Sequence, residues 1–121
     1  MTRLGRLKRR AEFLAAAAAN RKWVAPGLVL QARADARADR PSDIDIRLGF
    51  TASRKVGNAV KRNRARRRLK AVAAEVLKDV PQAQQPTDLV LIARPATVVR
   101  DYKALKEDFR RGLKKLGVGA S

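Results

Sequence analysis

Residues 61–70 read KRNRARRRLK, so seven of ten consecutive side chains are lysine or arginine. Arginine outnumbers lysine in this run, and a guanidinium is a rigid, planar donor that can hold a phosphate through two hydrogen bonds at once. Residues 51–70 contain nine basic side chains and no acidic one, so this stretch supplies no counter-charge of its own. The chemistry that fits is recognition of a polyanion, and Asn63 adds a donor and an acceptor that can bind a sugar, a base or a water.

The composition argues against catalytic groups. The chain has no cysteine and no histidine, which removes disulfides, thiolate nucleophiles, imidazole bases and the usual zinc sites. Its eleven acidic residues are dispersed, so we expect no metal cluster and no catalytic residue in this chain. The formal net charge of +18 makes nucleic acid the expected partner, because binding a polyanion relieves self-repulsion on that scale.

The length of 121 residues predicts one domain, residues 1–121, with a flexible basic segment at 1–6. No apolar run approaches the roughly 20 residues that span a bilayer. The alanines after the basic N-terminus are too weakly hydrophobic for a signal peptide. We therefore expect a cytoplasmic protein with no membrane partner.

The spacing of apolar residues predicts the elements that position the basic run. Recurrence at three- and four-residue intervals predicts helices over residues 7–19, 58–79 and 100–116. Alternating or continuous apolar runs predict strands over residues 28–34, 44–52 and 89–93, with a short extra strand at 22–25. We interpret the polar segment between the first two long strands as a hairpin connection, and residues 81–87 as a linker. The result is an α+β sandwich whose central, mostly antiparallel sheet of about four strands is packed by three helices.

A projection of the second helix separates its packed side from its basic residues. At about 100° per residue, Leu69, Val72, Ala73 and Val76 form one apolar stripe, and Arg62 falls on that same stripe. The other basic residues point in all directions, so a single solvated face does not account for them. Like charges one helical turn apart repel without acidic partners. We predict a folded helix that presents its basic residues to a polyanion.

Several other side chains are open to more than one interpretation. For Phe13, core packing and a binding role are equally open. Trp23 and Tyr102 are assigned to the core or its edge. For Arg33 and Arg47, a solvated strand face and a functional role remain equally open.

Residues 49–67, GFTASRKVGNAVKRNRARR, resemble the signature of the bacterial ribonuclease P protein component family. In that family a strand ending in Ser-Lys-Lys-x-Gly-x-Ala-Val leads into a helix that opens Arg-Asn-Arg. The resemblance extends over essentially the whole chain, because RLK at 6–8, Glu12-Phe13 and LIAR at 91–94 also look like family positions. Arg54 replaces the first lysine of the motif and keeps its charge.

The resemblance implies an RNA-binding protein subunit of ribonuclease P, which assists the catalytic RNA in endonucleolytic removal of the 5′ leader from precursor tRNA. The RNA would carry out the catalysis and would hold the required Mg²⁺, with no cofactor bound tightly by the protein. The implied partners are the ribonuclease P RNA and precursor tRNA with its single-stranded leader, and no obligate protein partner is evident. The family fold also implies a left-handed strand–helix–strand crossover between residues 44 and 94, against the usual right-handed preference.

The resemblance also assigns residues by position. The RNA-facing surface would comprise Arg54, Lys55, Lys61, Arg62, Asn63, Arg64, Arg66, Arg67 and Lys70. A leader cleft between the first helix and the sheet would comprise Phe13, Ala17, Gln31 and Thr51. Family members often have an aromatic residue at position 17 and a tyrosine at position 31. Stacking on leader bases, worth about 1–3 kcal/mol per base, is therefore expected to be smaller here.

Three other functions share some of these features. A structural RNA-binding protein of the ribosomal type would share the charge and size but would need no cleft for single-stranded RNA. A stand-alone nuclease would need clustered carboxylates to hold metal ions. A DNA-binding architectural protein would share the charge, and only the strand-to-helix signature argues against it.

Overall fold

The computed structural model describes residues 3–34, 45–80 and 86–118. Its strands are β1 (Leu4–Arg6), β2 (Lys22–Val24), β3 (Leu28–Ala34), β4 (Ile46–Thr51) and β5 (Thr87–Ala93). Its helices are α1 (Arg10–Ala18), α2 (Ala59–Leu77) and α3 (Tyr102–Lys115). Two short 3-10 helices, η1 (Arg54–Val56) and η2 (Pro95–Val98), come before α2 and α3. The expected α+β fold with three helices is confirmed, and each predicted helix and strand is present within a few residues of its expected bounds.

The sheet differs from the expected one in size and pairing. It has five strands in the order β1-β4-β5-β3-β2, with β1–β4 and β4–β5 parallel and β5–β3 and β3–β2 antiparallel. It is therefore a mixed sheet, and the prediction of a mostly antiparallel sheet of about four strands is wrong. β5, the most continuously apolar strand, occupies the centre as expected, where both of its edges are paired and both faces are covered.

The predicted hairpin between residues 28–34 and 44–52 is also wrong. β5 lies between β3 and β4 and pairs with both of them. Local patterning suggested a hairpin because the two strands follow one another in sequence, but the central place goes to the strand that is apolar on both faces. The connection, residues 35–44, and residues 81–85 of the expected linker lie outside the described residues.

Strand β1 lies within the segment 1–6 that we expected to be flexible. It pairs in parallel with β4, and the Asp45 carboxylate accepts a hydrogen bond from the backbone N–H of Arg3 at 2.9 Å. Three residues with one apolar side chain give no periodic signal, so its pairing with β4 could not be anticipated from the sequence.

The sheet has a separate hydrophobic cluster on each face. The larger one lies against α2 and α3 and includes Leu30, Leu69, Leu91 and Phe109, all fully buried. The smaller one lies against α1, with Leu7, Ala16 and Val90 at its centre and Phe13 and Ile92 partly buried around it. The α1 face is therefore less completely covered than the opposite face.

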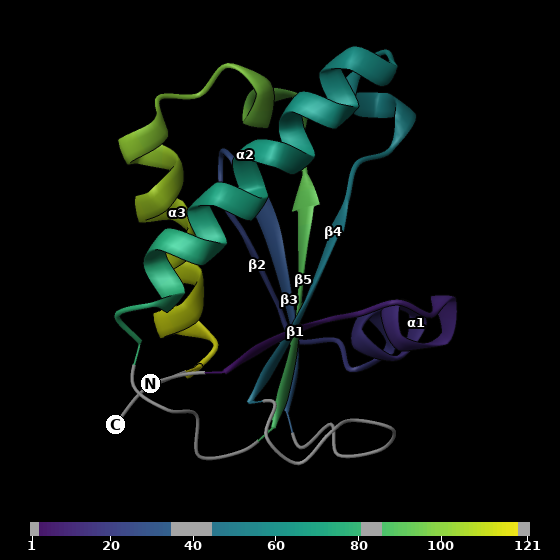
Figure 1. The fold of residues 1–121 in the computed structure, drawn as a ribbon, viewed down its shortest axis with the longest axis vertical. Helices are drawn as coiled ribbons and strands as arrows, with labels where there is room; N and C mark the ends of the chain where they lie inside the picture. The colour runs from purple at the N-terminus through teal and green to yellow at the C-terminus, as the bar shows by residue number, and fades with distance from the viewer. Residues whose placement is uncertain (1–2, 35–44, 81–85, 119–121) are drawn as a thin grey trace.

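The connection from β4 through α2 to β5 places the basic run. In Figure 1 the chain rises along β4, returns in α2 across the front of the sheet, and rises again in β5, to the left of β4. This is a left-handed crossover, as the resemblance implied. The start of α2 projects beyond the end of β5 (Figure 1), so its first turns lie past the sheet.

Candidate nucleic-acid interface

The turn that leads into α2 is built from a buried anchor, a glycine and a cap. Val56 at the end of η1 is buried in the larger cluster. Gly57 has φ of 141° and ψ of −157°, a conformation that is essentially restricted to glycine. The Asn58 side-chain oxygen then accepts a hydrogen bond from the backbone N–H of Lys61 at 3.0 Å, which caps the helix. The motif thus fixes where α2 begins and in which direction it points.

The apolar stripe of α2 packs as the projection predicted. Leu69, Val72 and Ala73 are fully buried against the sheet and α3. Arg62, on the same stripe, is only half-buried. The difference follows from the overhang of α2, because the stripe has no sheet beneath it at its first turns.

Most of the predicted RNA-facing cations have no internal counter-charge. Within the described part of the chain, no ion pair or hydrogen bond is formed by the side chains of Arg54, Lys55, Lys61, Arg62, Arg67 or Lys70. All of them are exposed except the half-buried Arg62. This leaves a cluster of charged donors on one rigid helix and the turn before it.

Three further predicted residues make internal contacts. Arg64 donates from Nε to the backbone carbonyl of Val98 at 3.1 Å. Arg66 donates to the side-chain oxygen of Asn63. The Asn63 oxygen is thereby occupied, and its amide N–H groups remain available as donors.

Arg68 is a structural residue that the sequence did not distinguish from its neighbours. Its guanidinium donates to the carbonyls of Thr97 at 2.6 Å and Arg100 at 2.5 Å. Both acceptors lie in or just after η2, which the sequence did not predict. Arg68 therefore ties the middle of α2 to the segment before α3.

A hollow of about 250 Å³ lies where α2 meets the start of α3, lined by Arg64, Arg67, Arg68, Ala71 and Tyr102. The Tyr102 hydroxyl donates to Glu75 at 2.9 Å, and Lys106 donates to the same carboxylate at 3.0 Å. These two hydrogen bonds lower the pKa of Glu75, whereas burial and the Glu75 charge raise the pKa of Tyr102. Tyr102 is thus neutral at physiological pH, and the charge lining the hollow is positive.

The structure brings the predicted leader-cleft residues to the α1 side of the sheet. Gly49 and Gln31 flank Val90 in one row across the sheet, and Thr51 pairs with Ile92 in the next row. The Phe13 ring lies on Gly49, since a Cβ there would be 2.4 Å from a ring carbon. Phe13, Gln31 and Thr51 are half-buried.

Ala17, the fourth predicted cleft residue, is on α1, one helical turn beyond Phe13. Its side chain is exposed. It therefore adds no ring to this surface, which is left with a single aromatic residue among the predicted four.

Arg47 lies on the same sheet face in a buried ion network. It is 5% exposed, and its Nε and Nη2 each donate to the Asp88 carboxylate at 2.8 Å while Nη1 donates to Glu12. A solvated strand face is therefore the wrong interpretation of Arg47. Arg33 approaches Asp88 at 3.9 Å and remains 35% exposed. The network joins α1 to β4 and β5 across more than 70 positions of sequence, from Glu12 to Asp88, so local spacing could not reveal it.

The charge of Glu12 depends on this network. Burial raises the pKa of Glu12, but hydrogen bonds from the backbone N–H groups of Lys8 and Arg9 and the charge of Arg47 outweigh that effect. The net result is a lowered pKa. Glu12 is thus held as a carboxylate between the start of α1 and the sheet.

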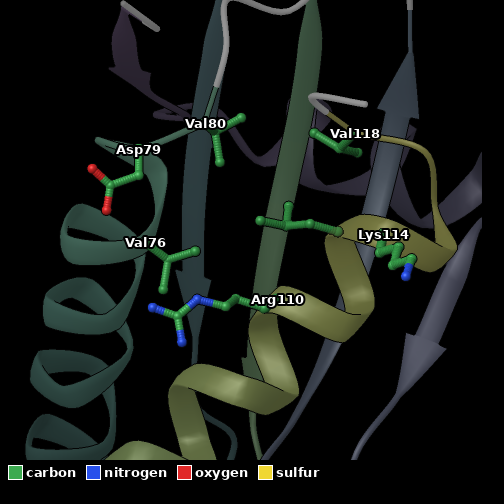
Figure 2. A pocket seen from close by; sticks show the side chains of 7 residues that line it. Val76, Asp79, Val80, Arg110, Lys114 and Val118 are labelled. Carbon is green, nitrogen blue, oxygen red and sulfur yellow. The ribbon is translucent and has the colours of Figure 1, made fainter. Parts of the chain in front are cut away.

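A second hollow, of about 290 Å³, lies far from the basic turns, between the C-terminal ends of α2 and α3. Figure 2 shows the side chains that line it, with Val76, Val80 and Val118 around its apolar part and Asp79, Arg110 and Lys114 as its charged members. Its walls continue the larger hydrophobic cluster.

Within residues 3–34, 45–80 and 86–118, no group of three or more acidic side chains is placed to hold a metal ion. None of the helices in those ranges has both the length and the apolar character needed to cross a membrane.

Comparison with known proteins places these features in a family. The model of the family Ribonuclease P matches residues 1–117. A ribonuclease P protein component from Paramagnetospirillum magneticum is 49% identical over 115 residues, covering 95% of this chain and 84% of the relative. One from Gluconacetobacter diazotrophicus is 48% identical over 116 residues, covering 96% and 94%.

Solved structures agree on the fold. An RNase P protein mutant from Staphylococcus aureus, described as defective in mRNA degradation activity, superposes with a TM-score of 0.70 at 25% identity, covering 93% of this chain and 88% of that one. The RNase P protein from Thermotoga maritima gives a TM-score of 0.67 at 23% identity, covering 88% and 92%.

The matched residues include the whole strand-to-helix turn, the basic half of α2 and both faces of the sheet. The family implies association with the ribonuclease P RNA, which sets aside the ribosomal, nuclease and DNA-binding alternatives. The chain therefore belongs to the bacterial ribonuclease P protein component family, as the protein subunit of the holoenzyme that assists the RNA in 5′ processing of precursor tRNA.

Proposed function

We propose that η1 and the first three turns of α2 bind the ribonuclease P RNA, and that the α1 face of the sheet holds the single-stranded 5′ leader of precursor tRNA. The observation that carries the first assignment is the group of cations without internal partners in this part of the chain. Arginines with free guanidinium groups on a rigid helix can meet phosphates without first losing much conformational freedom.

The anchoring of α2 supports this assignment. Arg64 and Arg68 donate to backbone carbonyls in η2 and at Arg100, so the helix is fixed against the segment before α3. The glycine turn and the Asn58 cap fix its start. RNA would therefore meet a preformed surface, with Asn63 offering amide donors among the charged groups.

The α1 face suits a single strand of RNA rather than a helix. Val29, Ile92 and Thr51 form a half-buried row that α1 leaves partly open, next to the row on which Phe13 lies. A base can stack against Phe13 or Ile92, and Gln31 and Thr51 supply hydrogen-bonding groups. With alanine at position 17, stacking contributes less to leader affinity, and hydrogen bonding and charge take a larger share than they would beside a second aromatic residue.

The role that follows is that of a cofactor for RNA catalysis in the cytoplasm. The protein screens repulsion between the RNA subunit and the leader, positions the leader, and thereby raises the affinity of the complex for precursor tRNA and for the Mg²⁺ that the RNA holds. No group of this chain takes part in bond cleavage, and no other protein is required.

The test is to add the purified chain to its cognate ribonuclease P RNA and precursor tRNA at low Mg²⁺ concentration. We expect stimulation of 5′ cleavage, weakened when Arg62→Ala and Arg67→Ala are combined, since neither side chain has an internal partner to lose. Lys103→Ala with Arg110→Ala removes the same charge from exposed positions of α3 and is the matched control. Equal loss in both double variants would refute the α2 assignment, and cleavage by the protein alone would refute the cofactor role.

The leader assignment has its own test. Precursor tRNAs with a full-length leader and with a leader of one nucleotide are compared for binding to the holoenzyme. We expect the protein to favour the full-length leader, and Thr51→Val and Gln31→Ala together to reduce that preference by about threefold to tenfold. An unchanged preference would place the leader elsewhere.

A further inference from the structure

A third hollow lies at the outer edge of the sheet, between β2 and the last turns of α3. Its volume is about 580 Å³, within the usual size range of ligand pockets, and its lining residues are Trp23, Arg111, Lys114 and Lys115. We call it the Trp23 pocket. None of these residues belongs to α2 or to the α1 face, and three of the four are cations.

The Trp23 ring packs against α3 at Gly112, where the helix has no side chain. A Cβ at Gly112 would lie 3.0 Å from Cδ1 of Trp23, so the ring approaches the helix backbone where there is no side chain. Glycine in the interior of a helix is otherwise unfavourable. The Lys115 ammonium lies 5.9 Å from the ring centroid, within reach of a cation–π interaction.

The indole N–H of Trp23 lacks a hydrogen-bond acceptor in the described part of the chain. The Nε1 atom is buried and has no hydrogen-bond partner within the described residues. Buried indole N–H groups usually find an acceptor, because an unpaired one loses its hydrogen bond to water without replacement. Since Nε1 is out of contact with solvent, a ligand in the pocket could reach it only if the ring moved.

We propose that the Trp23 pocket binds an unpaired nucleotide of an RNA chain, with the base against the indole and the phosphate between Arg111, Lys114 and Lys115. An aromatic ring beside cations is the arrangement that holds single-stranded nucleic acid without reading its sequence. The proposal depends on the family's association with RNA, but not on the assignment of that RNA to α2.

The location of the Trp23 pocket distinguishes it from the two proposed RNA-binding surfaces, the start of α2 and the α1 face of the sheet. β2 forms one edge of the sheet and β1 forms the opposite edge. The Trp23 pocket lies beside β2. An RNA bound at the start of α2 would have to extend past α3 to reach it. The Trp23 pocket would therefore bind a second RNA segment.

The test uses the fluorescence of Trp23, which is the only tryptophan in the chain. The full chain is titrated with a single-stranded oligoribonucleotide, and we expect saturable quenching. Arg111→Ala, Lys114→Ala and Lys115→Ala together should weaken the midpoint by about tenfold or more. The matched control, Lys78→Ala with Lys103→Ala and Arg110→Ala, removes the same charge from exposed positions outside the pocket and should shift the midpoint less than about threefold. Circular dichroism checks that both triple variants are folded.

Two further arms identify the ligand and the site. Adenosine monophosphate should quench only at much higher concentration, because it lacks the flanking phosphates; equal midpoints would overturn binding of an RNA chain. Quenching should persist in the Arg62→Ala/Arg67→Ala variant, so its loss there would assign the signal to α2. Absence of quenching by the oligonucleotide, or equal weakening by the two triple variants, would also overturn the proposal. Neither result affects the cleavage test of the proposed function.

Discussion

Arg67 and Arg68 are adjacent in the sequence but have different roles in the structure. Arg67 is exposed and has no side-chain partner within the described residues, whereas Arg68 donates to two backbone carbonyls. Composition could identify the basic run as a polyanion surface. It could not say which arginine is structural, because the acceptors of Arg68 lie in and after a 3-10 segment that has no periodic signal.

Arg68→Ala is expected to destabilise the protein by about 1–3 kcal/mol, since it leaves the carbonyls of Thr97 and Arg100 without a donor. Arg67→Ala is the control and should change stability by no more than about 0.5 kcal/mol. Urea unfolding followed by circular dichroism measures both. Equal stabilities of the two variants would mean that Arg68 does not anchor α2.

Glu12 makes stability depend on pH in a definite direction. Its pKa is lowered in the folded protein from an ordinary value of 4.5, so it stabilises the fold above that pH and loses the contribution as the pH falls through the folded value. Glu12→Gln should therefore lower stability at pH 7 and flatten the decline below about pH 4.5. Urea unfolding between pH 7 and pH 3 at constant salt measures the effect. Parallel curves for Glu12→Gln and the unchanged chain would contradict it.

Among the elements, those with strong periodicity were predictable and those defined by pairing were not. The strand Leu28–Ala34 has its predicted bounds, and α2 begins at Ala59, one residue after its predicted start. The insertion of β5 between β3 and β4 depends on contacts remote in sequence, as does the pairing of β1. The resemblance, rather than the periodicity, indicated the crossover.

The same limit applies to the candidate interface. The apolar spacing correctly placed the cations of residues 61–70 on one helix. The resemblance assigned Phe13, Gln31 and Thr51 to one cleft, and in the structure they lie on the same side of the sheet. The Arg47–Asp88–Glu12 network could not be predicted, because its members come from three elements. These contacts connect parts of the chain that no local window contains.

The conformation of the turn before α2 predicts how stability changes when its glycine is replaced. Gly57→Asn should cost about 1–3 kcal/mol, since its φ of 141° with ψ of −157° is essentially unavailable to other residues. Gly117→Asn is the matched control, because φ of 70° is a conformation that asparagine adopts and no atom lies within 4 Å of an added Cβ. Thermal unfolding compares the two variants. If Gly117→Asn lowered stability as much as Gly57→Asn, the claim that the turn before α2 requires glycine would be contradicted.

At the scale of the whole molecule, the charge of +18 is distributed over surfaces with different roles. Some cations are used internally, as Arg47, Arg68 and Arg100 are. Arg62 and Arg67 on α2 have no side-chain partner within the described residues, and a further group of cations lines the Trp23 pocket. Total charge favours association with RNA in general, and under the proposed function the position of the free cations determines where the RNA binds.

The most direct test of the central claim is the salt dependence of affinity for the ribonuclease P RNA. If the start of α2 contacts phosphates, Arg62→Ala/Arg67→Ala should weaken binding and make the slope of log affinity against log salt shallower by about one unit per lost contact. Lys103→Ala/Arg110→Ala should leave the slope close to that of the unchanged chain. Identical slopes for the two double variants would contradict the claim that the free cations of α2 form the RNA interface.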